Sequence, residues 1–424
     1  MLNFRRHRRG FAKTTFRITL VVCLLAVHLA GARAEAGWWK GNLHTHTFWS
    51  DGDDFPEMVM QWYKAHGYHF LALSDHNVLS QGQRWMVVAD NRRNALEKYR
   101  DRFGDGWIET RQNDKDQTEV RLKPLSECRS LFEEPDRFLL IQAEEITTKA
   151  HLNGINLLEL IKPQGGATMA ELLQNNIDAV REQAQRTGRA MLVHINHPNF
   201  QWALTAEDML DLEGMVFFEL YNAHGYVNNE GNERRASTER MWDIMLTKRL
   251  AETKAEVVYA VATDDTHNYH KFDPRAANPG QAWVMVRAAQ LTPESIIRAM
   301  DAGDFYCSTG VTLEDIAFED KTLTVTVAAE PGVTYTTQFI GTRRGYDPAS
   351  QPVTDAEGKE LRTTRVYSAE MGAVLAEVEG TTARYQLEGD EIYVRAKVIS
   401  SRKNDNSHVP DEREAAWTQP VVVK

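Results

Sequence analysis

The chain has 424 residues, a formal net charge of −11 and 42% hydrophobic residues. This length suits one large domain with a smaller appended one, and the composition excludes disordered and fibrous classes of protein. The acidic balance argues against nonspecific binding to nucleic acid or to an anionic membrane surface.

The first 34 residues predict an export signal. Several arginines between Arg5 and Arg17 precede the short apolar run 18–30, and small residues follow it. This order is typical of a cleaved secretory signal, with an uncleaved anchor as the alternative, and the Arg8-Arg9 pair resembles a twin-arginine signal. We expect an exported protein, periplasmic or extracellular, without a membrane span after cleavage. Its charge would be about −18, because the segment holds seven basic residues and no acidic one.

Residues 35–310 repeat one pattern, in which an amphipathic helix and a glycine precede an apolar strand that ends in metal-binding residue types. The strands are YHFLALS, FLLIQ, AMLVHI, GMVFFEL and AEVVYAVAT. Nearly continuous apolar strands separated by helices favour parallel strands covered by helices. Thr168 and Thr292 are predicted to cap two helices that end near Gly188 and Gly303. The polar residues that follow the strands predict a site at their C-terminal ends.

Two further segments stand apart from this pattern. The charged stretch 84–137 is interpreted as a helix-containing insertion over the site. Residues 311–424 contain short alternating strands with turn residues between them, which predicts a small antiparallel β-sandwich as an accessory domain. Cys128 and Cys307 remain after the signal and could pair, but two cysteines do not make a disulfide scaffold.

The residue types at the strand ends suit divalent cations. Residues i and i+2 of an extended chain point to the same side, so His44 and His46 could face one ion. Imidazole and carboxylate together bind zinc, manganese and iron. Further candidates on the same rim are too many for one ion and could supply two or three: Asp51, Asp75, His76, Glu145, His151, His197, Asp265, His267.

The motifs LHTHTFWSDG, LALSDHN, EEIT, INHPN and TDDTH, in this order between residues 41 and 310, resemble those of the PHP (polymerase and histidinol phosphatase) superfamily. The resemblance implies an α/β fold, a distorted TIM-like (β/α)7 barrel with two or three divalent ions that usually hydrolyses phosphoesters. The C-terminal strands resemble the tail of exported PHP proteins. Paired cations at such a site lower the pKa of a shared water and neutralise phosphoryl oxygens.

The same resemblance assigns the ligands by motif. One ion takes His44, His46, Glu145 and Asp265; a second takes Glu145, His151 and His197; a third takes Asp51, His76 and His267. Two motifs leave an alternative open, because EEIT also offers Glu144 and VHINHP also offers His194.

Other rim residues are assigned roles around the ions. Asp264 is placed in the catalytic set as a partner that orients its neighbouring ligand. Asn77, Asn222 and His224 are candidates for contact with substrate, and His224 also for protonating a leaving group. Hydrogen bonding within the loops is the alternative for these three residues.

The sequence therefore predicts an exported phosphomonoesterase or phosphodiesterase that acts on a small or short phosphoester with two or three ions of manganese, zinc or iron. A metal-dependent hydrolase of another bond, such as an amide, and a metal-stabilised binding protein are the alternatives. The ester, the metal and the oligomeric state stay open.

Overall fold

The computed structural model describes residues 36–423, so the predicted export signal lies outside the described residues. Within this range, no helix has both the length and the apolarity needed to cross a membrane. Cys128 and Cys307 are both buried and both free.

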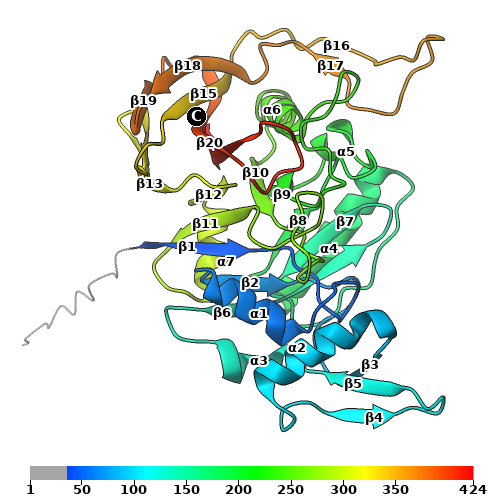
Figure 1. The fold of residues 1–424 in the computed structure, drawn as a ribbon. Helices are drawn as coiled ribbons and strands as arrows, with labels where there is room; N and C mark the ends of the chain where they lie inside the picture. Colours follow the sequence, from blue (N-terminus) through cyan, green and yellow to red (C-terminus); the bar gives the residue numbers. More distant parts are fainter. Residues whose placement is uncertain (1–35, 424) are drawn as a thin grey trace, which may run out of the picture. The chain divides into compact units, whose positions relative to one another are not determined.

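A mixed 14-stranded sheet organises the chain (Figure 1). Its first part runs in the order β10-β9-β8-β7-β6-β2-β1-β11-β12. The strands of this part are β1 (Gly37–Asn42), β2 (Phe70–Leu73), β6 (Leu139–Thr147), β7 (His151–Ile155), β8 (Leu192–Ile195), β9 (Val216–Asn222), β10 (Val258–Thr263), β11 (Trp283–Ala288) and β12 (Phe305–Ser308). The helices between them are α1 (Pro56–Ala65), α4 (Met169–Thr187), α5 (Glu207–Leu210), α6 (Thr238–Lys248), the π-helical turn η2 (Arg249–Thr253) and α7 (Pro293–Asp301).

The expected parallel pairing holds for four strand pairs, β1-β2, β2-β6, β8-β9 and β9-β10. Strand β7 is not among the predicted strands; it lies between β6 and β8 and is antiparallel to both. Only three residues separate β6 from β7, too few for the crossover that parallel strands need. Because β7 runs in the opposite direction, its first residue, His151, lies at the edge where β6 and β8 end.

The capping predictions are confirmed for two helices. Thr168 accepts a hydrogen bond from the backbone N–H of Glu171 at the start of α4, and Gly188 ends that helix with a left-handed φ of 67°. Thr292 accepts from the backbone N–H of Ser295 at the start of α7. These bonds satisfy backbone donors that the first helical turn leaves free.

The charged stretch 84–137 folds as its own small layer of helices and strands. It contains β3 (Arg84–Val87), the short η1 (Asp90–Arg92), α2 (Arg93–Phe103), β4 (Thr110–Gln112), β5 (Thr118–Leu122) and α3 (Leu125–Phe132). Its three strands form an antiparallel sheet in the order β3-β5-β4. Leu96, Tyr99 and Val120 of this layer pack with Trp49 and Phe55, so it is attached beside the loop that follows His46.

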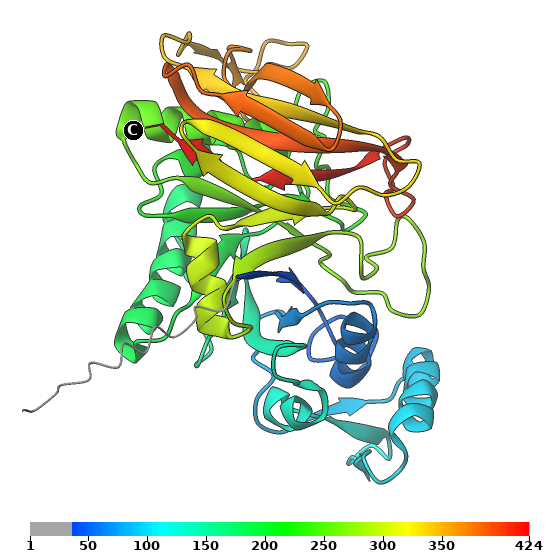
Figure 2. The same ribbon diagram turned by 90° about the vertical axis from the view of Figure 1, so that its left-hand side faces the viewer.

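The residues after 310 build the small two-stranded sheet β16-β17 and two larger antiparallel sheets. One has the order β13-β14-β19, and the other, β21-β20-β15-β18, continues the large sheet through β12. Figure 2 shows their long yellow, orange and red strands side by side. The strands are β13 (Leu313–Glu319), β14 (Thr322–Val327), β15 (Tyr335–Arg343), β16 (Ser350–Gln351), β17 (Val366–Tyr367), β18 (Ala373–Glu379), β19 (Thr382–Gln386), β20 (Glu391–Lys403), β21 (Arg413–Thr418) and β22 (Val421–Val422).

Two apolar clusters join these parts. Leu323 and Val325 of β14 share a buried cluster with Phe339 of β15 and Val398 of β20, so the two C-terminal sheets face one core. Trp417 of β21 belongs instead to the large cluster of the preceding α/β part. The C-terminal strands are thus packed against the α/β part by apolar side chains as well as by strand pairing.

Candidate metal centre

The first two histidines of the site follow β1 in an extended segment. Thr45, between them, forms a parallel bridge with Thr266 after β10, and the backbone N–H of His46 donates to the carbonyl of Thr266 at 2.9 Å. Both rings therefore lie on the same side of the chain, as the i, i+2 spacing predicts. Their Nε2 atoms face each other at 3.1 Å, and both side chains are fully buried.

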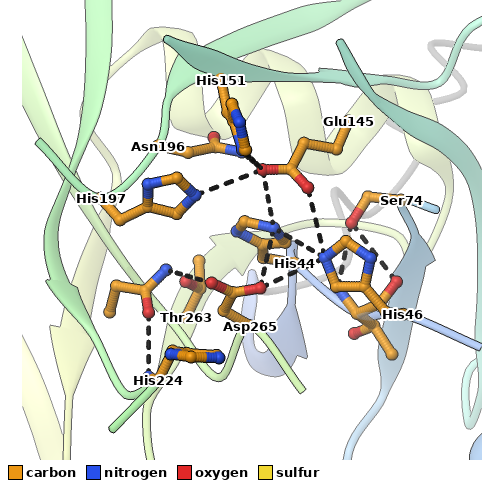
Figure 3. Close-up of polar contacts among 12 residues, drawn as sticks. His44, His46, Ser74, Glu145, His151, Asn196, His197, His224, Thr263 and Asp265 are labelled. Carbon is orange, nitrogen blue, oxygen red and sulfur yellow. Dashed lines mark hydrogen bonds and ion pairs between the residues drawn. The ribbon is translucent and has the colours of Figure 1, made fainter. Parts of the chain in front are cut away.

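Glu145, near the end of β6, lies at the centre of the histidines (Figure 3). Its two oxygens lie within 3.4 Å of a ring nitrogen of each of five residues: His44, His46, His76, His151 and His197. Oε1 also accepts a hydrogen bond from Asn196 Nδ2 at 2.9 Å. The buried Oε2 lies 2.7 Å from Nδ1 of His76 but makes no well-aligned hydrogen bond. A buried carboxylate oxygen without an aligned donor is costly unless a cation neutralises it.

Four groups of side chains bring their donor atoms within 4.8 Å of one another. The groups are His44, His46 and Asp265; His44, Glu145 and His197; His76, Glu145 and His151; and His46, Asp51, His76 and His267. Together they contain all nine residues that the motifs assign as ligands. The grouping differs from the assigned sets, because His151 lies with His76 and His197 lies with His44.

The charged groups of the site favour the binding of a cation. The ion-pair partners of Glu145, Asp265 and Asp51 are all histidines, and no lysine or arginine within residues 36–423 pairs with these carboxylates. Burial opposes ionisation of Glu145 and Asp265, but the neighbouring histidines outweigh it and hold the pKa of both carboxyls well below the usual range. Burial, with help from His267, lowers the pKa of His46 to about 3, whereas the neighbouring carboxylates outweigh burial and raise the pKa of His44, His76, His197 and His267. Without an ion, protons on these rings balance the carboxylates. A bound ion would displace those protons, because imidazole binds zinc, manganese and iron in its neutral form.

Two acidic residues hold the loops that carry the ligands. Asp75 accepts hydrogen bonds from the backbone N–H and the hydroxyl of Thr47 at 2.8 and 2.9 Å and from Ser50 Oγ at 2.7 Å. It thereby fixes the turn that leads to Asp51, whose side chain is 54% exposed. Asp75 itself belongs to none of the four groups.

Asp264 faces away from the four groups. Its carboxylate accepts hydrogen bonds from Tyr63 Oη, from Asn42 Nδ2 and from the backbone N–H groups of residues 280–282. Among the described residues it makes no hydrogen bond or ion pair with an assigned ligand. These contacts anchor the loop after His267 to β1 and α1, which makes Asp264 a support for its neighbour Asp265.

The three residues assigned to substrate contact differ in how far their side chains are engaged in hydrogen bonds within the protein. Asn222 is buried, and its amide group donates to Glu219 Oε2 at 2.7 Å and to Asp265 Oδ2 at 3.1 Å. Asn77 is exposed, but both ends of its amide bond to the backbone of Thr147. The His224 ring lies 5.4 Å from the His267 ring, centre to centre. Of the three, His224 has the side chain least committed to other residues.

Glu219 is the main residue of the candidate site that the sequence motifs do not predict. It is fully buried on β9, and its Oε1 lies 2.7 Å from Nδ1 of His44. Burial alone would raise its pKa, but His44 outweighs that effect and lowers the pKa to about 2. The available signal was a single acid in the apolar strand GMVFFEL, because an unpaired carboxylate in such a strand is costly.

No family model and no curated protein matches this sequence. Among solved structures, the chain is similar to a crystal structure from Bacteroides vulgatus ATCC 8482, of a two-domain protein described as containing a predicted PHP-like metal-dependent phosphoesterase. The two chains are 15% identical, and their superposition has a TM-score of 0.40. The similarity covers 91% of this chain and 96% of the other.

Proposed function

We propose that the protein is a metal-dependent phosphoesterase whose ions are held by the nine residues of the candidate metal centre. The observation that carries this proposal is a set of ionised carboxylates whose ion-pair partners are all imidazoles. No lysine or arginine within residues 36–423 forms an ion pair with them. Two or three divalent ions of manganese, zinc or iron fit the four groups of donors. The PHP-type motifs that contribute these residues favour a phosphoester over an amide as the bond that is hydrolysed.

Divalent ions bound here would supply Lewis acidity and a water that ionises near neutral pH. His224 is the side chain best placed to act beside them. Burial lowers its pKa, so the ring is neutral. The backbone N–H of Tyr226 donates to Nδ1 of His224 at 3.3 Å, which leaves the ring proton on Nε2. We assign to this Nε2–H a hydrogen bond to the leaving oxygen of the ester.

The finer architecture belongs to the same proposal. The bridge between Thr45 and Thr266 links the first and last strands of the run β1, β2, β6–β10 and supports a closed barrel of seven strands. The core shared by the two C-terminal sheets supports an accessory β-sandwich over residues 311–424.

We also propose export, because basic, apolar and small residues follow one another in segment 1–34 in the order typical of a secretory signal. N-terminal sequencing of the protein from a periplasmic or culture fraction tests this point.

The enzyme proposal is tested by metal analysis of the purified protein together with a panel of phosphomonoesters and phosphodiesters, assayed with added Mn²⁺, Zn²⁺ or Fe²⁺. We expect bound divalent metal and hydrolysis of at least one ester. The variant His46→Ala should lose activity while its circular dichroism spectrum stays that of the wild type. Bound metal with hydrolysis of amides alone would replace the phosphoesterase proposal, and neither metal nor hydrolysis would overturn it in favour of a binding protein.

A further inference from the structure

Glu219 has a carboxylate whose hydrogen-bonding capacity is used up within the protein. Oε1 accepts from Nδ1 of His44 and from the hydroxyl of Thr263, both at 2.7 Å. Oε2 accepts from the backbone N–H of His197 and from Nδ2 of Asn222, again both at 2.7 Å. A carboxylate offers about four acceptor sites, so Glu219 has none left for an ion.

The contact with His44 determines which ring nitrogen can bind an ion. Because Glu219 accepts the proton of Nδ1, an ion that binds the ring must bind it at Nε2, in place of the proton there. This Nε2 lies 3.1 Å from Oδ1 of Asp265 and 3.1 Å from Nε2 of His46. Glu219 therefore points the free nitrogen of His44 at the other donors of the site.

The two contacts of Oε2 act on ligands whose backbone is in the left-handed region. His197 has a φ of 26° and Asp265 a φ of 50°, conformations that residues other than glycine seldom adopt. Glu219 bonds the backbone N–H of His197 directly. It reaches Asp265 through Asn222, whose Nδ2 also donates to Asp265 Oδ2 at 3.1 Å.

We infer that Glu219 is a positioning residue that prepares His44, His197 and Asp265 together for metal binding without touching the metal. One buried carboxylate on β9 thus links ligands contributed after β1, β8 and β10. This inference rests on the metal-binding part of the proposed function. It goes beyond that function because it assigns the positioning of these three ligands to a residue that does not bind the metal.

The variant Glu219→Gln tests the inference. The amide keeps the shape of the side chain, but its NH₂ group cannot accept a proton, so two of the four donors lose their partner. We expect the affinity for Mn²⁺ alone, measured by isothermal titration calorimetry, to fall about 10- to 100-fold, the range typical of partners that orient a ligand. The matched control is Glu57→Gln, because Glu57 is equally buried and accepts from Tyr99 Oη at 2.6 Å and Trp107 Nε1 at 2.9 Å. Glu57 contacts no assigned ligand, so this control should bind Mn²⁺ like the wild type.

A spectroscopic measurement separates positioning from a general loss of stability. In protein labelled with ¹⁵N-histidine and kept at a pH at which the His44 ring is neutral, the His44 signals, identified by their loss in His44→Gln, should report a proton on Nδ1 in the wild type. In Glu219→Gln the proton should move toward Nε2. Glu219→Asp retains the charge and serves if the glutamine variant does not fold; we expect its Mn²⁺ affinity to lie between those of the wild type and Glu219→Gln.

The outcomes distinguish the inference from the proposed function. Wild-type affinity in both Glu219 variants, with the His44 proton unmoved, would overturn the positioning role and leave the phosphoesterase proposal intact. A wild-type protein that binds no divalent metal would overturn both. Equal losses of affinity in Glu219→Gln and Glu57→Gln would show that the effect comes from stability and would also overturn the positioning role.

Discussion

At the residue scale, the adjacent Glu144 and Glu145 show how strand geometry separates two identical side chains. Neighbouring residues of a strand point to opposite faces. Glu145 points into the metal centre, whereas Glu144 accepts a hydrogen bond from the backbone N–H of Ile161 at 3.0 Å and contacts no histidine. Burial raises the pKa of Glu144 to about 7, so the two carboxyls also differ in charge.

We expect Glu145→Gln to lose metal and activity. The amide removes the charge that several imidazoles surround, so the divalent-metal affinity should fall by about 100-fold or more, beyond the effect of residues that only orient a ligand. Metal content after gel filtration and the rate with the best phosphoester measure this effect. Glu144→Gln is the matched control and should retain both, and wild-type metal content in Glu145→Gln would contradict the central role of this residue.

Some residues of the candidate site could be predicted from the sequence, and others could not. The assigned ligands stand in short motifs with recognisable spacing, and the structure gathers them at one place. Glu219 has no such motif, because its role depends on a contact with His44, 175 residues away in the chain. The division of ligands among ions stays a prediction, because it depends on distances between loops that no local pattern records.

At the scale of elements, helix α6 and strand β20 are joined by a buried charge network. Arg395 donates to both oxygens of Asp243 at 2.9 and 2.7 Å and to Glu239 Oε1 at 3.1 Å. Lys397 Nζ donates to the other oxygen of Glu239 at 2.7 Å. A charge inside such a network is costly once its partners are lost, so the network fixes how the helix packs on the strand.

This network predicts a specific dependence of stability on pH. Burial alone would raise the pKa of Glu239, but Arg395 and Lys397 outweigh it and lower the pKa from 4.5 to about 2. As the pH falls, Glu239 therefore takes up a proton near pH 4.5 in the unfolded chain but only near pH 2 in the folded chain. The stability contributed by Glu239 is complete above that window and is lost as the pH falls through it.

The variant Glu239→Gln should reveal this contribution. Its free energy of unfolding in urea should lie below that of the wild type by on the order of 2 kcal/mol at pH 6, and the gap should shrink toward pH 3. Glu233→Gln removes an exposed glutamate and should change the free energy by less than about 0.5 kcal/mol at either pH. A gap that stays constant or widens on acidification would contradict the assigned pKa shift.

The elements also show where sequence patterns stop being informative. Helices α4 and α7 follow from Thr168 and Thr292, because a cap is a local interaction. The direction of β7 does not follow from its apolar residues, because parallel and antiparallel buried strands have similar composition. The short connection of residues 148–150 was the usable signal, since a parallel crossover needs a dozen or more residues.

At the scale of the whole molecule, the sheet passes without interruption from the α/β part into the C-terminal strands. Strand β12 pairs with β21, and Trp417 lies in the apolar cluster of the α/β part. Tyr221, near the metal centre, donates from Oη to Glu412 Oε2 at 2.9 Å. The two parts therefore share backbone hydrogen bonds, apolar core and a polar contact close to the site.

We expect this continuity to make the described chain unfold in one cooperative transition. Separate domains would melt apart only if few contacts crossed between them, whereas here a strand pair and a core cluster cross. Tryptophan fluorescence and far-ultraviolet circular dichroism should give coincident urea curves. Two separated transitions would show that residues 311–424 fold independently of the α/β part.

The same charge balance that motivates the proposed function also links metal to global stability. Without ions, the carboxylates of Glu145, Asp265 and Asp51 have only histidines as ion-pair partners. Ions that bind the folded state alone would no longer stabilise it. Ligand at about 100 times its dissociation constant contributes about 2.7 kcal/mol, which in a chain of this size corresponds to about 3–5 °C in Tm. We expect dialysis against a chelator to lower Tm by this amount and added Mn²⁺ or Zn²⁺ to restore it, as measured by differential scanning calorimetry. Glu145→Gln should show little response to either treatment, because its site has lost the central carboxylate; an equal shift in the variant and the wild type would place the stabilising ions elsewhere in the molecule.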